Sequence, residues 1–243
     1  MRLVTFPGVL RPPSDAFMLA NQLRQERLGE KSSVLDLCAG SGMLAVVAAQ
    51  SGAGRVTALD ISRRALLATR LNARLNGVHV RAVGGDLFAA VQGEHFDVIV
   101  SNPPYLVSAS DTLPRRGASR AWNAGTSGRA FLDRICDQAH WHLTQGGVLL
   151  LVHSSLCSEQ TTVDALARQG YDVSITMRHR GPLGDRMRPR AEMLRSRGLL
   201  GDEELEDIVV VRAVWPGGPR ETNLAQAGPA LEQVSSGASA GSA

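Results

Sequence analysis

The segment Asn102-Pro103-Pro104-Tyr105 carries residue types that could hold a planar nitrogen group against an electrophile. The Asn102 side-chain oxygen and the Pro103 carbonyl oxygen can accept hydrogen bonds from the two N–H groups of an amide or aryl amine. Such acceptors stabilise the positive charge that develops as the nitrogen attacks. The prolines stiffen the segment and add no competing donor, and Tyr105 offers an aromatic wall. We therefore predict that these four residues are catalytic.

A second group of residues could bind a nucleoside. The motif Asp36-Leu-Cys-Ala-Gly40-Ser-Gly42 follows a predicted strand and opens a helix, and its glycines allow a sharp turn beside the helix N-terminus. Asp60 ends the second predicted strand, where a carboxylate can accept both ribose hydroxyls. Asp86 ends the third, where it can accept the exocyclic amine of adenine, with Leu87 supplying a backbone contact. Each acid alone could instead cap a helix.

Two nucleotide cofactors fit this pattern. The NAD fingerprint permits alanine at its third position, which is Ala45 here, so the glycines alone do not exclude NAD. Asp36 weighs against it, because a carboxylate at the start of the turn would face a pyrophosphate. The same carboxylate suits the amino group of S-adenosyl-L-methionine. We therefore predict that cofactor, with its sulfonium methyl group facing Asn102.

These residues require elements that bring them to one edge of a sheet. Short apolar runs alternate with helical patterns, which indicates βαβ units and a mostly parallel sheet. The predicted strands are Val34–Cys38, Val56–Asp60, Val80–Val83, Phe96–Ser101, Val148–His153, Val173–Met177 and Ile208–Val214. The predicted helices are Ser14–Arg27, Ser41–Ser51, Ser62–Asn76, Gly128–Leu143 and Ser158–Gln169. This order resembles the α/β fold of class I methyltransferases, a Rossmann-like seven-stranded sheet with helices on both faces and an antiparallel last strand.

The composition limits the classes of protein to which the chain could belong. The 243 residues are 44% apolar and 20% charged, which is enough for a sizeable core. The three cysteines form no CxxC pair, so neither a disulfide framework nor a zinc site is expected, and no metal is predicted. The apolar runs are too short to span a bilayer and no signal peptide is evident. We therefore expect a cytoplasmic protein that does not contact membranes.

The chain divides into three predicted parts. Residues 1–30 form an N-terminal segment and helix, 31–215 the methyltransferase domain, and 216–243, which is rich in Gly, Pro, Ser and Ala, a disordered tail. The stretch Arg178–Gly198 holds seven arginines and falls in the connection between the last two strands. It could contact RNA or the ribosome, although a solvated hairpin of this composition needs no function.

The two motifs together resemble the HemK family of protein-glutamine N5-methyltransferases, in the short branch that lacks a separate N-terminal helical domain. Two further stretches are similar to motifs of that branch. They are Val9-Leu-Arg-Pro-Pro-Ser-Asp15-Ala-Phe17-Met-Leu and Ala121-Trp-Asn-Ala-Gly125-Thr-Ser-Gly128-Arg129 followed by Asp133. The resemblance spans about Val9 to Val214.

The resemblance implies roles for particular residues and partners. Asn102 to Tyr105 would bind a target glutamine in a protein such as a translation release factor, and a small activating protein could assist. The chain departs from the branch at Arg11, Ala16 and Cys38, where an acid, threonine and glycine are usual. The complete predicted set of cofactor-binding residues is Asp36, Cys38, Gly40, Gly42, Asp60, Ile61, Asp86, Leu87 and Asn102.

Other functions remain open on the sequence alone. Enzymes that methylate adenine N6 or guanine N2 in nucleic acids use the same Asn-Pro-Pro-aromatic motif. A small-molecule amine or amide is a further alternative substrate. A non-catalytic module that keeps the cofactor fold is a third. His153 could line the site or pack in the core, and Trp122 could cover the target or anchor packing.

Overall fold

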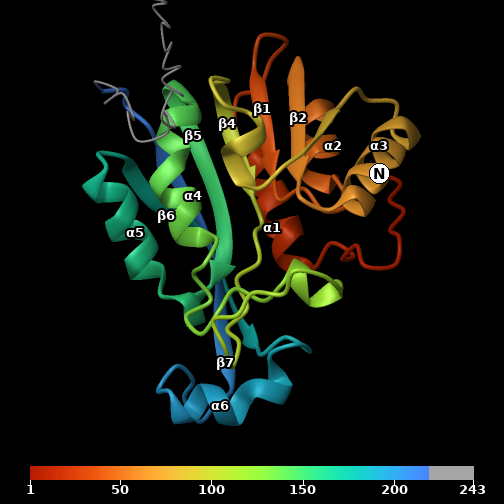
Figure 1. Ribbon diagram of the computed structural model, residues 1–243. Coiled ribbons are helices and arrows are strands. Elements are labelled where there is room, and N and C mark those ends of the chain that lie inside the picture. The colour runs from red at the N-terminus through yellow and green to blue at the C-terminus, as the bar shows by residue number, and fades with distance from the viewer. Residues whose placement is uncertain (219–243) are drawn as a thin grey trace, which may run out of the picture.

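The computed structural model describes residues 1–218, in which seven strands form one sheet with helices on both faces (Figure 1). The strand order is β3-β2-β1-β4-β5-β7-β6, and β7 runs antiparallel to both of its neighbours. The predicted α/β fold with an antiparallel last strand is confirmed. The strands are β1 Ser33–Leu37, β2 Arg55–Asp60, β3 Arg81–Gly84, β4 Phe96–Ser101, β5 Leu143–Ser154, β6 Asp172–Pro182 and β7 Leu205–Val214.

The helices fall between the strands in the expected alternation. The α-helices are α1 Ser14–Leu23, α2 Met43–Gln50, α3 Arg63–Leu75, α4 Leu132–Gln138, α5 Glu159–Arg168 and α6 Ala191–Ser196. Short 3-10 helices are η1 Leu87–Ala90, η2 Ala118–Ala121, η3 Ala139–His142, η4 Ser155–Cys157 and η5 Arg188–Arg190. No helix within residues 1–218 is long and apolar enough to cross a bilayer.

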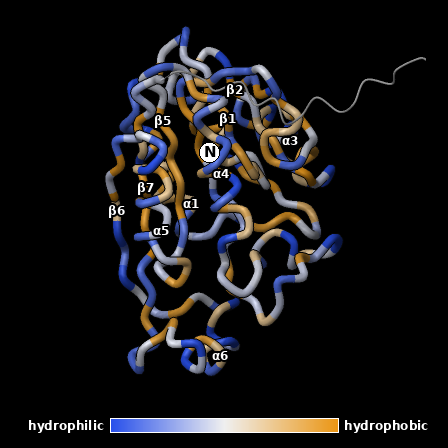
Figure 2. The backbone as a smooth tube through the Cα atoms, turned by 60° about the vertical axis from the view of Figure 1, so that its left-hand side comes forward, coloured by the Kyte–Doolittle hydropathy of each residue, from blue (hydrophilic) through white to orange (hydrophobic). Residues whose placement is uncertain are grey.

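Two hydrophobic cores lie on opposite faces of the sheet. Side chains alternate across a strand, so Val98 and Val100 of β4 pack towards α1 and α2, whereas Ile99 packs towards α4 and α5. The central strands are buried on both faces, which explains their continuous apolar runs. Figure 2 shows hydrophobic residues along β5 and hydrophilic residues along much of the edge strand β6.

Several predicted boundaries need correction. The predicted helix Gly128–Leu143 is confined to α4 and η3, because Gly128 (φ +72°) turns the chain where a Cβ would lie 2.5 Å from the Tyr105 carbonyl oxygen. Helix α1 stops at Leu23, four residues before its predicted end. Strand β5 begins five residues earlier than predicted, at Leu143, which pairs with Phe96.

Only part of the arginine-rich stretch connects the last two strands. Residues 178–182 belong to β6 and pair with β7 as far as Pro182 opposite Leu205. This end of the hairpin is polar, so it carries no apolar signal in the sequence. The remaining segment, with η5 and α6, buries Leu183, Met187 and Leu194 against Val107. The predicted tail lies outside the described residues from 219 onward.

Candidate active site

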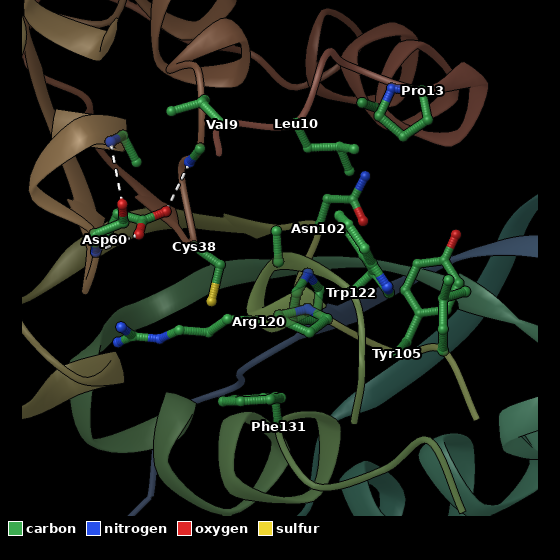
Figure 3. Close-up of a pocket in the computed structure, with 18 of the residues that line it drawn as sticks. Val9, Leu10, Pro13, Cys38, Asp60, Asn102, Tyr105, Arg120, Trp122 and Phe131 are labelled. Carbon is green, nitrogen blue, oxygen red and sulfur yellow. Dashed lines mark hydrogen bonds between the residues drawn. The ribbon is translucent and has the colours of Figure 1, made fainter. Parts of the chain in front are cut away.

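A cavity of about 1410 Å³ opens at the carboxyl ends of β1, β2 and β4. This is the edge where ligands bind in open α/β sheets. Ten of the residues predicted for the site line it, namely Cys38, Gly40, Asp60, Ile61, Asp86, Leu87, Asn102, Pro103, Pro104 and Tyr105. Asp36 and Gly42 do not line it. The residues of both predicted motifs therefore meet in one space (Figure 3).

Asp60 and Gly40 form one wall of the cavity. The two carboxylate oxygens of Asp60 accept hydrogen bonds from the Gly40 and Ser62 amides, each at 2.8 Å. Burial raises the pKa of Asp60 above its usual value, and these hydrogen bonds oppose the rise. A Cβ built on Gly40 would meet no atom within 4 Å. The wall thus combines a fixed carboxylate with open space beside it, which fits the ribose of a nucleoside.

Asp36 lies behind this wall and is fully buried. Its Oδ2 accepts a hydrogen bond from the Ala45 amide at 2.9 Å, and its Oδ1 has no partner. Burial, reinforced by repulsion from Asp60, raises the pKa of Asp36 to about 7, against the Ala45 hydrogen bond. The predicted contact with an ammonium group stays a prediction, because the carboxylate does not reach the cavity lining.

Gly42 also lies outside the lining, for a different reason. It precedes α2 with φ +75°, and a Cβ there would come within 2.7 Å of the Thr69 side chain. The glycine therefore allows α2 and α3 to pack closely.

Asp86 meets a partner that sequence reasoning missed. Arg134 of α4 donates to both Asp86 carboxylate oxygens, at 2.8 and 3.3 Å, and also lines the cavity. The two side chains are about half exposed. Arg134 directly follows Asp133, the last residue of the second stretch that resembles the HemK branch, but that resemblance gave Arg134 no role. A ligand that contacts Asp86 would share the carboxylate with this guanidinium group.

The predicted catalytic segment leaves β4 and turns into the cavity. Ser101, the last residue of the strand, donates its hydroxyl hydrogen to the Leu37 carbonyl at 2.7 Å and so ties β4 to β1. Asn102 and Tyr105 then both contact Asp15 of α1. The Asn102 amide nitrogen donates to Asp15 Oδ1 at 3.1 Å, and the Tyr105 hydroxyl donates to Oδ2.

Asp15 was not predicted as a site residue. It is 5% exposed and lines the cavity. The sequence held one signal, its place in the N-terminal motif that resembles the HemK branch. That motif did not show which residues Asp15 would contact, because Asn102 is 87 residues away in the chain.

The loop after the catalytic segment forms the opposite wall. Trp122 lines the cavity, and the guanidinium carbon of Arg186 lies 4.7 Å from the centre of its ring. Arg190 donates to the Val107 carbonyl and to the Asn123 side-chain oxygen. Arg197 donates to the carbonyls of Ser108, Ala109 and Thr126.

All seven arginines of the 178–198 stretch contact other groups of the protein. Arg178, Arg180, Arg188 and Arg195 form ion pairs, Arg190 and Arg197 bind loop carbonyls, and Arg186 covers Trp122. These contacts lie within the protein, and the predicted contact of this stretch with RNA or the ribosome stays a prediction.

His153 takes no part in the cavity. It is fully buried, Nδ1 lies 2.9 Å from the Ser154 carbonyl oxygen, and burial lowers its pKa to about 4. Among residues 1–218, no group of three or more His, Cys, Asp or Glu side chains is arranged to hold a metal ion.

Comparisons with known proteins point to one enzyme family. Residues 14–115 match the family model of the methyltransferase small domain. The chain is 32% identical over 187 residues to a Methanocaldococcus jannaschii protein named "Putative protein N5-glutamine methyltransferase", covering 77% of this chain and 93% of that protein. It is 38% identical over 157 residues to the release factor glutamine methyltransferase of Deinococcus radiodurans, covering 62% of this chain and 56% of that enzyme.

Solved structures support the fold. The structure of the Mtq2–Trm112 complex of E. cuniculi, which methylates the translation termination factor eRF1, contains a chain that matches with a TM-score of 0.60. The match covers 86% of this chain and 99% of that one, at 21% sequence identity. At this identity the likeness concerns the fold alone, and it agrees with the class I methyltransferase architecture expected from the sequence.

Proposed function

The chain belongs to the protein N5-glutamine methyltransferase family, and from that membership we propose that it transfers a methyl group from S-adenosylmethionine to the side-chain amide of a glutamine in a protein. The observation that carries the proposal is a single cavity lined both by Gly40 and Asp60 and by the Asn102–Tyr105 segment. A methyl donor and an amide acceptor need this proximity.

The cofactor would lie along the wall formed by Gly40 and Asp60. The free space beside Gly40 and the remaining lone pairs of the Asp60 carboxylate suit a ribose. The Asp86 carboxylate and the neighbouring Leu87 amide would hold the adenine ring. When bound, S-adenosylmethionine supplies an electrophilic methyl group on a sulfonium sulfur.

Asn102 and Pro103 would prepare the acceptor nitrogen. The lone pair of an amide nitrogen is delocalised into its carbonyl, which makes it a poor nucleophile. The Asn102 side-chain oxygen and the Pro103 carbonyl would accept its two N–H groups and favour the form with the lone pair on nitrogen. The buried Tyr105 ring would flank the amide plane. We assign no general base, since the nitrogen can release its proton to water after the transfer.

We propose a translation release factor as the protein substrate. The supporting observation is that the Deinococcus radiodurans relative carries that name. A small activating protein is a further proposed partner, because the E. cuniculi neighbour is part of a two-protein complex. Contact with RNA through residues 178–198 has no comparable support, since the arginines there already contact the protein.

The experiment is a methyl-transfer assay with labelled S-adenosylmethionine and three acceptors: a release factor with a Gly-Gly-Gln loop, duplex DNA and ribosomal RNA. The proposal expects label on the release factor alone and one added methyl group on its glutamine by peptide mass spectrometry. A release factor with that glutamine replaced by alanine serves as the matched control. Label on nucleic acid only would show that the substrate class is wrong.

A further inference from the structure

The Asp15 carboxylate joins the two functional side chains of the predicted catalytic segment. Its Oδ1 accepts from the Asn102 amide nitrogen at 3.1 Å and from the Ala16 backbone amide at 2.6 Å. Its Oδ2 accepts from the Tyr105 hydroxyl. One buried group on α1 thus contacts two residues that follow β4. Both contacts join side chains and are not part of the backbone hydrogen bonding of α1 or β4.

A carboxylate in this place fixes which end of the Asn102 amide faces α1. An ionised carboxylate can only accept hydrogen bonds. It therefore pairs with the amide nitrogen and excludes the amide oxygen. Figure 3 shows the Asn102 nitrogen turned toward the N-terminal segment and the oxygen turned away from it. The acceptor that the proposed reaction needs is thereby kept on the free side of the amide.

The negative charge also affects the strength of that acceptor. Hydrogen bonds in a chain polarise one another in a medium of low dielectric constant. Donation from the Asn102 nitrogen to a carboxylate increases electron density on Asn102 Oδ1. A more basic oxygen binds more strongly to an N–H group that gains positive charge. This effect is greater at the transition state than in the ground state, so it raises kcat more than it lowers KM.

A purely structural role would not require a charge. Asp15 lies in the first turn of α1 and binds the Ala16 amide, a task that asparagine performs about as well. Burial raises the pKa of Asp15, against the hydrogen bonds from Tyr105, Ala16 and Asn102, so keeping the group ionised opposes folding. Residues that lower stability in this way concentrate at functional sites.

We propose that Asp15 is a positioning residue that orients the Asn102 amide, with its oxygen toward the substrate, and fixes the Tyr105 ring. The inference rests on the proposed methylation of a glutamine amide. It concerns a residue whose proposed effect on the acceptor nitrogen passes through its contacts with Asn102 and Tyr105.

The test compares Asp15→Asn with the wild type. Asparagine keeps the volume but removes the charge, and only its oxygen can accept, so its two ends cannot accept from both Asn102 and Tyr105 as the two carboxylate oxygens do. We expect kcat on the release factor to fall about 10- to 100-fold, as when a reacting group loses its orientation. The acceptor KM and the calorimetric affinity for S-adenosylmethionine should stay near wild type, and the Tm should equal or exceed that of the wild type, because a buried charge is removed. Asp97→Asn is the matched control, because Asp97 holds Ser33 and Thr144 far from the cavity. It should lower Tm and leave kcat unchanged.

Two further measurements separate positioning from structure. In the Asn102→Ala background, Asp15→Asn should cause a smaller loss of turnover than in the wild-type background, because the part of its effect that passes through Asn102 is already gone and only the part through Tyr105 remains. The side-chain amide signal of Asn102, assigned by its absence in Asn102→Ala, should show one exchange-protected proton in the wild type and none in Asp15→Asn. An Asp15→Asn enzyme with wild-type kcat, or an equal further loss in the double variant, would overturn the inference.

The outcomes distinguish this inference from the proposed function. If the wild type transfers no methyl group to the release factor, the proposed function fails, and the catalytic part of this inference is overturned with it. The exchange protection of the Asn102 side-chain proton then still tests whether Asp15 orients the Asn102 amide. A protected proton that persists in Asp15→Asn would overturn that role as well.

Discussion

Gly40 and Gly42 both have positive φ angles, +56° and +75°, but the space beside them differs. A Cβ at Gly40 would point into empty space, whereas one at Gly42 would clash with Thr69. The sequence motif alone does not distinguish the two glycines. In the structure, Gly40 leaves space in the cavity for a ligand, whereas Gly42 allows helices α2 and α3 to pack closely.

The first prediction pairs Gly40→Ala with Gly42→Ala. Each substitution should lower the free energy of unfolding by about 1 kcal/mol, because alanine is strained at positive φ. Gly42→Ala should lower it by about 2 kcal/mol more, because the added methyl group is overpacked against Thr69. Gly40→Ala should weaken binding of S-adenosylmethionine, and Gly42→Ala should leave it near wild type. Urea unfolding and calorimetry measure the two effects. Equal effects of both variants on stability and binding would contradict this division.

The second prediction concerns the buried Asp36. Its pKa is about 7 in the folded protein and 3.8 in the reference state, so the folded state binds one proton more between these values. The free energy of unfolding should therefore fall as pH rises from about 4 to 7, by at most about 1.4 kcal/mol per pH unit, and level off above 7. Asp36→Asn should remove this contribution. Urea unfolding of both proteins at several pH values measures this dependence. If the free energy of unfolding changes with pH in the same way for the wild type and Asp36→Asn, the prediction is contradicted.

At the scale of elements, the segment between β6 and β7 supports the loop that follows the catalytic residues. It shares a small core with Val107, and Arg190 and Arg197 bind carbonyls of the loop. Three of the seven arginines in this stretch, Arg186, Arg190 and Arg197, therefore contact a wall of the cavity. Arg186 of the same segment contacts the Trp122 ring.

The third prediction is that Arg190→Ala loosens this wall. Loss of the hydrogen bonds to Val107 and Asn123 should cost about 1–3 kcal/mol of stability. The acceptor KM should rise about 10-fold, and the affinity for S-adenosylmethionine should not change. Arg180→Ala is the control in the same hairpin, because its ion pair with Glu203 is exposed and contributes little. An unchanged acceptor KM in Arg190→Ala would show that the loop does not need this support.

Sequence patterns predicted the strands that are buried on both faces, and β4 agrees at both ends. The patterns failed where polar residues extend an element, as Glu206 and Asp207 do in β7, or where a contact distant in sequence stops one, as at Gly128. At the site they predicted residues that follow strand ends. Asp15 and Arg134 were missed because their importance comes from partners 87 and 48 residues away.

At the scale of the whole molecule, the strand order explains how distant residues meet. In the order β3-β2-β1-β4-β5, the chain winds outward from β1 to β3 and then returns to β4 on the other side of β1. A crevice opens at the carboxyl edge where this direction reverses. Asp60 and Asn102 reach that edge from either side, and α1 adds Asp15 from one face. The proposed donor and acceptor sites thus meet at the point of reversal.

The measurement that tests this account most directly is methyl transfer by Asn102→Ala to a release factor, together with calorimetric binding of S-adenosylmethionine. The account predicts near wild-type cofactor affinity, because Gly40 and Asp60 are untouched, and a fall in kcat of at least about 100-fold. Asn21→Ala, on the exposed side of α1, should behave as wild type. Transfer by Asn102→Ala at the wild-type rate would contradict the central claim that the Asn102 oxygen activates the acceptor nitrogen.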